Sequence, residues 1–309
     1  MTGSAFTARL VLARRLVTGV PTVLGAYALL FSTVSLQAAE PPAESAAATY
    51  LIDTLGVPVA PVAVRERTGW HEPRIILTDA KLSALLPQLR GIAPKARFVE
   101  MPEANARDIA DADVALGVCT QEMLEQAKRI QWIQTLGAGV DRCVELPILH
   151  KRQPLVTNMQ RVAAPSMAEH VIALMLALSR RLPYFMKEQE QGRWIAYKDA
   201  PLLADLDGKT VLIAGLGGIG TEVAKRAHAL GMRVTATRAR GRSGPEYVYY
   251  VGLPDELLKL TKDADFVVNC TPLTPKTKGI FDQEFFAAMK PTAYFISVGR
   301  GPSTVTADL

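Results

Sequence analysis

Apolar and polar positions follow two different spacings along the chain after residue 74. Short apolar runs typical of strands, RIILT at 74–78 and ARFVEM at 96–101, flank KLSALLPQLRGI at 81–92, whose spacing predicts a helix. Further apolar runs are DADVALGV at 111–118, IQWIQTLG at 130–137 and PLVTN at 154–158, with the helical QEMLEQAKR at 121–129 among them. Strands that alternate with helices predict a parallel sheet that is covered on both faces.

A long helix is predicted from Ser166, where SMAEHVIALMLALSRR is apolar over almost its whole surface. Ser166 can cap the helix, with Glu169 three residues later, as in a capping box. A helix this apolar is expected to be buried between layers or against a partner subunit. His170 lies inside it and is expected to be a core or interface residue.

The pattern changes again at 209–237, where strand, glycine turn, helix and strand follow one another. KTVLIA at 209–214 predicts a strand, Gly215, Gly217 and Gly220 follow in G-x-G-x-x-G spacing, and TEVAKRAHALG leads to the strand MRVTAT. The first glycine allows the tight turn, the second lets the backbone approach a pyrophosphate, and the third lets helix and strand pack closely. The unit is therefore typical of dinucleotide binding, with the helix N-terminus facing the phosphates.

The choice between NAD and NADP is predicted from the residue at the ribose-binding position, which is Arg238. The acidic residue that binds a ribose 2′-hydroxyl lies about 20 residues beyond the glycine turn, and that position is arginine here. An arginine can donate several hydrogen bonds to a 2′-phosphate and neutralise it. We therefore predict NADP in preference to NAD, with Arg240 and Arg242 as possible helpers, or else a solvated arginine loop and another ribose contact.

The first 45 residues differ from the rest. Arg9, Arg14 and Arg15 precede a stretch that is uncharged from Leu16 to Ala39. This arrangement resembles a secretory signal, and the Arg14–Arg15 pair resembles a twin-arginine export signal. The apolar stretch is also long enough for a membrane anchor, and an arginine-rich start is also found in organelle transit peptides. Residues 1–45 are therefore expected to be a signal peptide or anchor with its linker.

Composition narrows the functional classes. The 309 residues are 49% hydrophobic and 21% charged, with a net charge of +5. The basic residues are scattered without interleaved aromatics, so nucleic acid is not expected as a partner. Cys119, Cys143 and Cys270 have no metal spacing and predict small buried side chains without a disulfide framework. The four histidines show no metal-ligating spacing, so no metal is expected.

Four segments together resemble the D-isomer-specific 2-hydroxyacid dehydrogenases, a family with glyoxylate and hydroxypyruvate reductases, phosphoglycerate dehydrogenase and formate dehydrogenase. They are IQWIQTLGAGVD at 130–141, MAEHVIALMLALSRR at 167–181, LIAGLGGIGTEVAKRAHALGMRV at 212–234 and TPLTPKTKGIFDQEFFAAMKPTAYFISVGRG at 271–301. The resemblance implies an α/β protein with a flavodoxin-like substrate domain at 70–165, a connecting helix at 166–190 and a Rossmann NAD(P)-binding domain, a doubly wound parallel sheet, at 191–309. Substrate would lie in the cleft between the domains.

The resemblance also implies roles for individual residues. Backbone N–H groups of Ala138 and Gly139 would hold the substrate carboxylate, and Arg300 would be the catalytic arginine that orients and polarises a 2-keto acid. Ser297 stands where the family commonly has asparagine, which is expected to change a local hydrogen bond. The cofactor-binding residues implied by motif and resemblance are Gly215, Gly217, Gly218, Ile219, Gly220, Arg238, Arg240, Thr271, Pro272, Val298 and Gly299.

The family's mechanism needs two further groups beyond the arginine, an acidic residue and a histidine that acts as general acid. The sequence stops nine residues after Arg300, so we expect a truncated member with an incomplete Rossmann sheet and little turnover. The parent protein would reduce a small 2-keto acid to the D-2-hydroxy acid as a homodimer. The alternative is a non-catalytic dinucleotide-binding protein with a redox-sensing or regulatory role.

Overall fold

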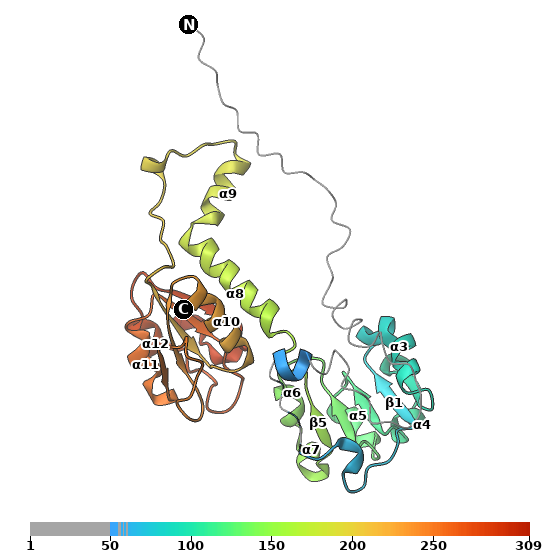
Figure 1. The fold of residues 1–309 in the computed structure, drawn as a ribbon. Helices are drawn as coiled ribbons and strands as arrows, with labels where there is room; N and C mark the ends of the chain where they lie inside the picture. Colours follow the sequence, from blue (N-terminus) through green and yellow to red (C-terminus); the bar gives the residue numbers. More distant parts are fainter. Residues whose placement is uncertain (1–49, 55–56, 58, 60) are drawn as a thin grey trace.

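The chain folds around two parallel five-stranded sheets (Figure 1). A computed structural model describes residues 50–54, 57, 59 and 61–309. The predicted signal, anchor or transit segment at 1–45 lies outside these residues. Within the described part of the chain, no helix has the length and apolarity to cross a membrane. The α/β class, with its doubly wound parallel sheet, is confirmed.

The first sheet has the order β2-β1-β3-β4-β5, with every neighbouring pair parallel. This is the flavodoxin-like order that the resemblance implied. Ile76 of β1 pairs with Phe98 on one side and with Val114 on the other. The strands are β1 (Ile75–Thr78), β2 (Arg97–Glu100), β3 (Val114–Leu116), β4 (Trp132–Gln134) and β5 (Leu155–Thr157).

Helices cover both faces of this sheet. Leu77, Ile133 and Met123 belong to the larger apolar cluster, and Ile76 and Val114 to a smaller one. The stretch predicted as one helix at 81–92 is a 3₁₀ turn followed by an α-helix. The helical elements are η1 (Tyr50–Thr54), η2 (Val64–Glu66), η3 (Ala80–Leu85), α3 (Leu86–Ile92), η4 (Met101–Glu103), α4 (Ala106–Ala110), α5 (Gln121–Gln126), α6 (Asp141–Val144) and α7 (Pro147–Arg152).

Cys119 and Cys143 form a disulfide, so the prediction of three unlinked cysteines is wrong. Cys119 follows β3 and Cys143 lies on α6, which follows β4. Neighbouring parallel strands end at one edge of the sheet, so the loops that follow them meet there, with the two Cα atoms 5.6 Å apart. A separation of 24 residues gives no hint of this contact in the sequence.

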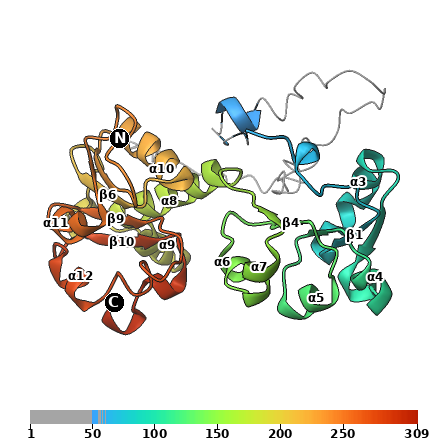
Figure 2. The same ribbon diagram turned by 90° about the horizontal axis from the view of Figure 1, so that it is seen from below.

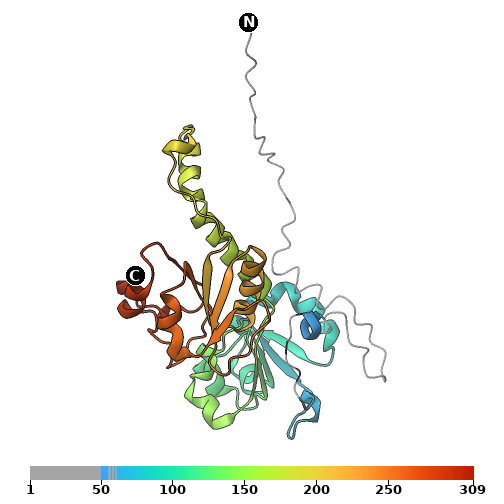
Figure 3. The same ribbon diagram turned by 60° about the vertical axis from the view of Figure 1, so that its left-hand side comes forward.

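The long helix, α8 (Ala164–Ser179), begins two residues before the predicted start. Pro165 occupies its first turn, and the hydroxyl of Ser166 donates to Ala163 O, so Ser166 is not the cap. Ala168, Val171 and Met175 are buried against the second sheet's core. His170 is exposed, so it is not a core residue, and the alternative of an interface position stays a prediction. α8 runs into α9 (Leu182–Glu190), and the two project from the second sheet (Figures 1 and 3).

The second sheet has the order β10-β9-β6-β7-β8, again fully parallel, and matches the first five strands of a Rossmann sheet. The strands are β6 (Thr210–Ala214), β7 (Arg233–Thr237), β8 (Tyr250–Gly252), β9 (Phe266–Asn269) and β10 (Tyr294–Ser297). The helical elements are η5 (Tyr197–Asp199), α10 (Gly218–Ala229), η6 (Pro254–Glu256), α11 (Leu257–Thr261), α12 (Gln283–Ala288), η7 (Gly301–Ser303) and η8 (Thr306–Asp308).

The two faces of the second sheet bury different clusters. Val211 and Ile213 of β6 face the α8–α10 side, with Val223 and Ala227 among their neighbours. Leu212 and Ala214 face the other side, where Phe281, Phe285 and Leu257 are buried. This alternation along β6 is the one expected for a strand with helices on both faces.

Both sheets use an aspartate to anchor their first strand. The carboxylate of Asp113, just before β3, accepts hydrogen bonds from the backbone N–H groups of Arg74 and Ile75. Asp265, just before β9, accepts from Thr210 N in the same relative position. Burial raises the pKa of both carboxyls, but their hydrogen bonds outweigh it and leave each pKa below its usual value.

Candidate active site

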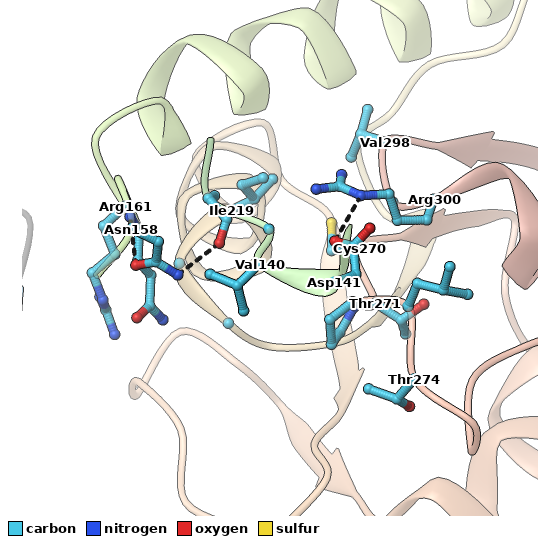
Figure 4. Close-up of a pocket in the computed structure, with 18 of the residues that line it drawn as sticks. Val140, Asp141, Asn158, Arg161, Ile219, Cys270, Thr271, Thr274, Val298 and Arg300 are labelled. Carbon is cyan, nitrogen blue, oxygen red and sulfur yellow. Dashed lines mark hydrogen bonds and ion pairs between the residues drawn. The ribbon is translucent and has the colours of Figure 1, made fainter. Parts of the chain in front are cut away.

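One cavity of about 450 Å³ lies at the carboxyl ends of the strands, where ligands bind in open parallel sheets. Its walls come from the loops after β4 and β5 of the first sheet and from those after β6, β9 and β10 of the second. Figures 2 and 4 show the two halves and the site. It is lined by Ala138, Gly139, Val140, Asp141, Val144, Asn158, Gln160, Arg161, Gly217, Gly218, Ile219, Cys270, Thr271, Pro272, Leu273, Thr274, Val298, Gly299 and Arg300.

The glycine turn has the geometry that its motif requires. Gly215 has φ +98°, a conformation that favours glycine, and a Cβ on Gly220 would lie 2.2 Å from Gly215 O. Gly217 and Gly218 line the cavity where α10 begins, and no side chain caps that helix. Uncapped N–H groups and the helix dipole suit a phosphate. The turn therefore fits a dinucleotide's pyrophosphate.

Arg300 lies directly against the loop predicted to hold the substrate carboxylate. A Cβ on Gly139 would come within 1.9 Å of Arg300 Nη2, so a larger residue there would displace the guanidinium. The side-chain amide of Asn158 donates to Ala138 O at 2.8 Å and so fixes the Ala138–Gly139 loop. Three residues that were predicted to bind substrate, Ala138, Gly139 and Arg300, thus meet in one place.

The Arg300 guanidinium forms an ion pair with Asp141, the first residue of α6 (Figure 4). The Nε atom donates to Asp141 Oδ1 at 3.3 Å, and the Asp141 side chain is only 16% exposed. The Arg300 carbonyl accepts from Ser303 Oγ at 2.6 Å. The pair joins the two halves of the molecule, because Asp141 follows β4 of the first sheet and Arg300 follows β10 of the second. The two residues are 159 positions apart in the chain.

Asn269, at the end of β9, organises the cofactor side of the cavity. Its amide donates to Ser303 Oγ and to Ser297 Oγ, and its carbonyl oxygen accepts from Thr271. A Cβ on Gly299 would lie 2.8 Å from Thr271 O, which brings the ends of β9 and β10 together. Ser297 thus accepts a hydrogen bond from Asn269, and the expected effect of its departure from the family pattern stays a prediction.

Four of the predicted cofactor residues lie outside the cavity lining: Gly215, Gly220, Arg238 and Arg240. The two glycines shape the turn. Arg238 follows β7 and donates from Nη1 to Ser243 O at 2.7 Å, and Arg240 is exposed. Arg242, predicted as a helper, forms an ion pair with Glu256 and donates to the Tyr250 hydroxyl.

No histidine is among the described residues that line the cavity. His71 is hydrogen-bonded to Asp113 just before β3, at the amino ends of the strands and so away from the cavity. His228 stacks on Tyr247. His150 and His170 are exposed. Cys270 lines the cavity, and burial raises the pKa of its thiol to about 12, so it stays protonated at neutral pH.

Sequence reasoning missed three residues that hold the site together: Asp141, Asn158 and Asn269. Asp141 stood inside the quoted GAGVD stretch and Asn158 ended a predicted strand. Asn269 directly precedes the TPLTPKT loop. A polar side chain at the carboxyl end of a parallel strand was the available signal in the last two cases.

Two parallel sheets with a glycine turn at the start of a helix define a Rossmann-type NAD-binding protein. Residues 172–309 match the family model of the D-isomer specific 2-hydroxyacid dehydrogenase, NAD binding domain. Residues 172–309 therefore carry the NAD-binding domain of the D-isomer-specific 2-hydroxyacid dehydrogenase family, and the chain is similar to members of that family.

Among curated relatives, D-3-phosphoglycerate dehydrogenase of Methanocaldococcus jannaschii is 32% identical over 62% of this chain and 37% of its own length. Glyoxylate/hydroxypyruvate reductase B of Escherichia fergusonii is 29% identical over 74% of this chain and 70% of its own. The chain thus spans little more than a third of the first of these relatives.

A solved structure of similar fold is the NADPH-dependent glyoxylate/hydroxypyruvate reductase of Sinorhizobium meliloti in complex with NADP and sulfate. It has a TM-score of 0.67 and 25% identity, over 76% of this chain and 75% of that one. A family protein of Aeromonas salmonicida has the same TM-score and 26% identity, over 77% and 76%.

Proposed function

We propose that the protein to which this chain belongs reduces a small 2-keto acid of the glyoxylate or hydroxypyruvate type to the D-2-hydroxy acid. The observation that carries this proposal is the single cavity in which the glycine turn, the Ala138–Gly139 loop and Arg300 meet. A curated relative and a solved structure whose names describe glyoxylate/hydroxypyruvate reductases support the substrate class.

The residues of the chain divide the work between two ligands. When bound, a reduced nicotinamide cofactor supplies a hydride to the keto carbon. Gly217, Gly218 and Ile219 would hold the pyrophosphate, and Val298 and Gly299 would form the wall beside the nicotinamide. The guanidinium of Arg300 and the N–H groups of Ala138 and Gly139 fix the carboxylate, and Arg300 also polarises the carbonyl oxygen.

The carbonyl oxygen gains a proton when the hydride arrives, and the cavity's described lining holds no histidine to donate it. Cys270 remains a thiol and Asp141 is tied to Arg300. We therefore expect the 309-residue chain to bind both ligands and to turn over slowly. Rapid NADPH-dependent glyoxylate reduction by this chain would contradict that expectation.

The proposal is tested by calorimetry with NADPH and then with oxalate, a dicarboxylate that mimics a 2-keto acid. Arg300→Gln should weaken oxalate binding to the NADPH complex at least tenfold, because charge-assisted hydrogen bonds contribute about 1.5–3 kcal/mol. Its NADPH affinity should stay within about twofold of the unchanged chain. Failure of the unchanged chain to bind either nicotinamide dinucleotide would overturn the proposal.

We also propose a preference for NADP over NAD. Arg238 follows β7 at the expected ribose position, and exposed Arg240 is close in sequence, so two cations are available to a 2′-phosphate. Arg238→Asp should lower the ratio of NADPH to NADH affinity at least tenfold. Arg242→Gln is the matched control, since Arg242 is already paired with Glu256. An unchanged ratio in Arg238→Asp would refute the preference.

A non-catalytic dinucleotide-binding role, redox-sensing or regulatory, is the second candidate. The observation that favours it is the described lining without a histidine general acid. The two candidates differ in the behaviour of oxalate, which a sensor has no reason to bind at Arg300. Dinucleotide binding without any oxalate binding would therefore favour the sensor.

The oligomeric state of the protein is proposed from its exposed apolar side chains. We propose a homodimer, because Leu182, Met186 and Trp194 are exposed on and just after the projecting α9. Sedimentation of the chain at several concentrations tests it, and a monomer at all of them would contradict it.

We also propose that the N-terminal signal directs export of the protein. An uncleaved protein confined to the cytosolic fraction would contradict this proposal.

A further inference from the structure

We infer that Asp141 is a positioning residue for Arg300. It takes the Nε atom of the guanidinium and so leaves both Nη atoms for the substrate carboxylate and carbonyl. The inference rests on the proposed function, because it assigns the free Nη atoms to a 2-keto acid.

The geometry of the ion pair supports this division. Arg300 Nε donates to Asp141 Oδ1, while Nη2 lies against Gly139. An arginine offers five N–H donors in a rigid fork, so fixing one edge fixes the direction of the other. The Nη side of the guanidinium lies against Gly139 of the carboxylate loop, in the cavity that Ala138, Gly139 and Arg300 all line, so one planar anion there can be held by both.

Asp141 is the fixed partner of the two. It is the first residue of a four-residue helix, α6, whose third residue is Cys143. The disulfide to Cys119 and the hydrogen bond from Cys143 N to Val140 O hold this helix in place. Arg300, by contrast, has a long side chain that is 43% exposed. Its rotamer freedom is reduced before the substrate arrives.

Asp141 also carries a charge that opposes the substrate. A carboxylate beside a carboxylate site repels the ligand, while its hydrogen bond orders the arginine that attracts it. The two effects separate in two variants. Asp141→Asn keeps an oxygen that accepts from Nε and removes the charge, and Asp141→Ala removes both.

The first measurement concerns Arg300 alone. Phenylglyoxal modifies arginines, and peptide mass spectrometry gives its rate at Arg300. We expect modification at least threefold faster in Asp141→Ala and a rate within about twofold of the unchanged chain in Asp141→Asn. Glu145→Ala is the matched control, because it removes an exposed carboxylate from the end of the same helix without touching the cavity.

The second measurement is oxalate binding to the NADPH complex. We expect about a tenfold loss in Asp141→Ala, no loss or a gain in Asp141→Asn, no change in Glu145→Ala, and NADPH affinity constant throughout. An Arg300 modification rate that is the same in Asp141→Ala and the unchanged chain would overturn the inference. Equal loss of oxalate binding in both Asp141 variants would overturn it too, since the charge would then decide.

These outcomes are separable from those of the proposed function. A changed modification rate in a chain that binds no oxalate leaves the Asp141–Arg300 pairing standing and removes the 2-keto acid from the site. If Asp141→Ala melts well below the unchanged chain, oxalate binding by Asp141→Asn decides. A loss of oxalate binding in that variant would overturn the inference, because its amide oxygen still accepts from Nε.

Discussion

The sheet of β1–β5 and the sheet of β6–β10 anchor their first strand in the same way but build their ligand-facing loops differently. Each uses an aspartate that accepts backbone N–H groups, Asp113 in one and Asp265 in the other. The second sheet then shapes its turn with two glycines: Gly215, at φ +98°, and Gly220, whose Cβ would lie 2.2 Å from Gly215 O. The first holds its loop with side chains: a disulfide and the amide of Asn158.

The difference shows which kind of site can be predicted from a few consecutive residues. A glycine turn is a property of six consecutive residues, whereas a loop held by partners depends on strands that meet only after folding. Three sets of variants test this contrast, beginning with the change expected to have the largest effect.

Gly220→Ala should be the most damaging single change in the second half. The new Cβ would lie 2.2 Å from Gly215 O and 3.0 Å from an Ile213 methyl, so backbone must move. We expect a loss of about 3 kcal/mol in unfolding free energy and loss of NADPH binding. Chemical denaturation and calorimetry measure the two effects.

Gly217→Ala is the control within the same turn. A Cβ at Gly217 meets nothing within 4 Å, and the residue has an ordinary φ of −93°. We expect its stability to be nearly unchanged and its affinity for a dinucleotide to fall, since the backbone there faces the phosphates. Equal destabilisation by the two alanines would show that close packing is not what the third glycine provides.

Reduction of Cys119–Cys143 should destabilise the first half. A bond that closes a loop of this length contributes about 3 kcal/mol in the chain-entropy model. We expect dithiothreitol to lower the melting temperature and to increase hydrogen exchange in α6 more than in β6–β10. The doubly substituted Cys119→Ala, Cys143→Ala chain should melt at one temperature with or without the reductant. A melting temperature that dithiothreitol leaves unmoved in the unchanged chain would contradict this.

The two anchoring aspartates should differ by a smaller amount. Asp113 is fully buried and accepts from two backbone N–H groups and His71, whereas Asp265 is 22% exposed and accepts from one N–H group and Lys290. Asp113→Asn should cost about 2 kcal/mol and Asp265→Asn about 1. Denaturant titration at neutral pH compares them, and a larger cost at Asp265 would reverse our ranking.

The same pair sets a pH dependence. Each folded-state pKa is below its usual value, so the stabilisation is complete above about pH 4, the unfolded pKa of an aspartate, and is lost as pH falls through the lowered folded pKa. Each Asn variant should therefore lose less stability than the unchanged chain between neutral pH and pH 3. The free energy of unfolding is measured for each Asn variant and for the unchanged chain as pH falls. A difference between variant and unchanged chain that does not shrink toward pH 3 would contradict this.

The sequence predicted most of the architecture. Apolar runs located all five strands of the first sheet and β6 and β7 of the second, and the glycine spacing located the turn. Local propensity did not place the start of α8, because Pro165 takes the first turn and Ser166 bonds backward to Ala163.

The candidate site was predictable where a backbone must come close to a ligand and not where side chains meet across the fold. Gly139, Gly217 and Arg300 were identified from motifs. Asp141 reaches Arg300 across 159 residues, and Asn269 joins three segments, so neither role can be deduced from neighbours in the chain. The ion pair of Arg242 with Glu256 could not be deduced for the same reason, since Glu256 lies beyond the next strand.

The bond between Cys119 and Cys143 forms only when two thiols surrender two electrons to an acceptor. The intact mass of the protein taken from its own cells, lighter by two hydrogens when the bond is present, therefore keeps a record of the redox conditions under which the chain matured.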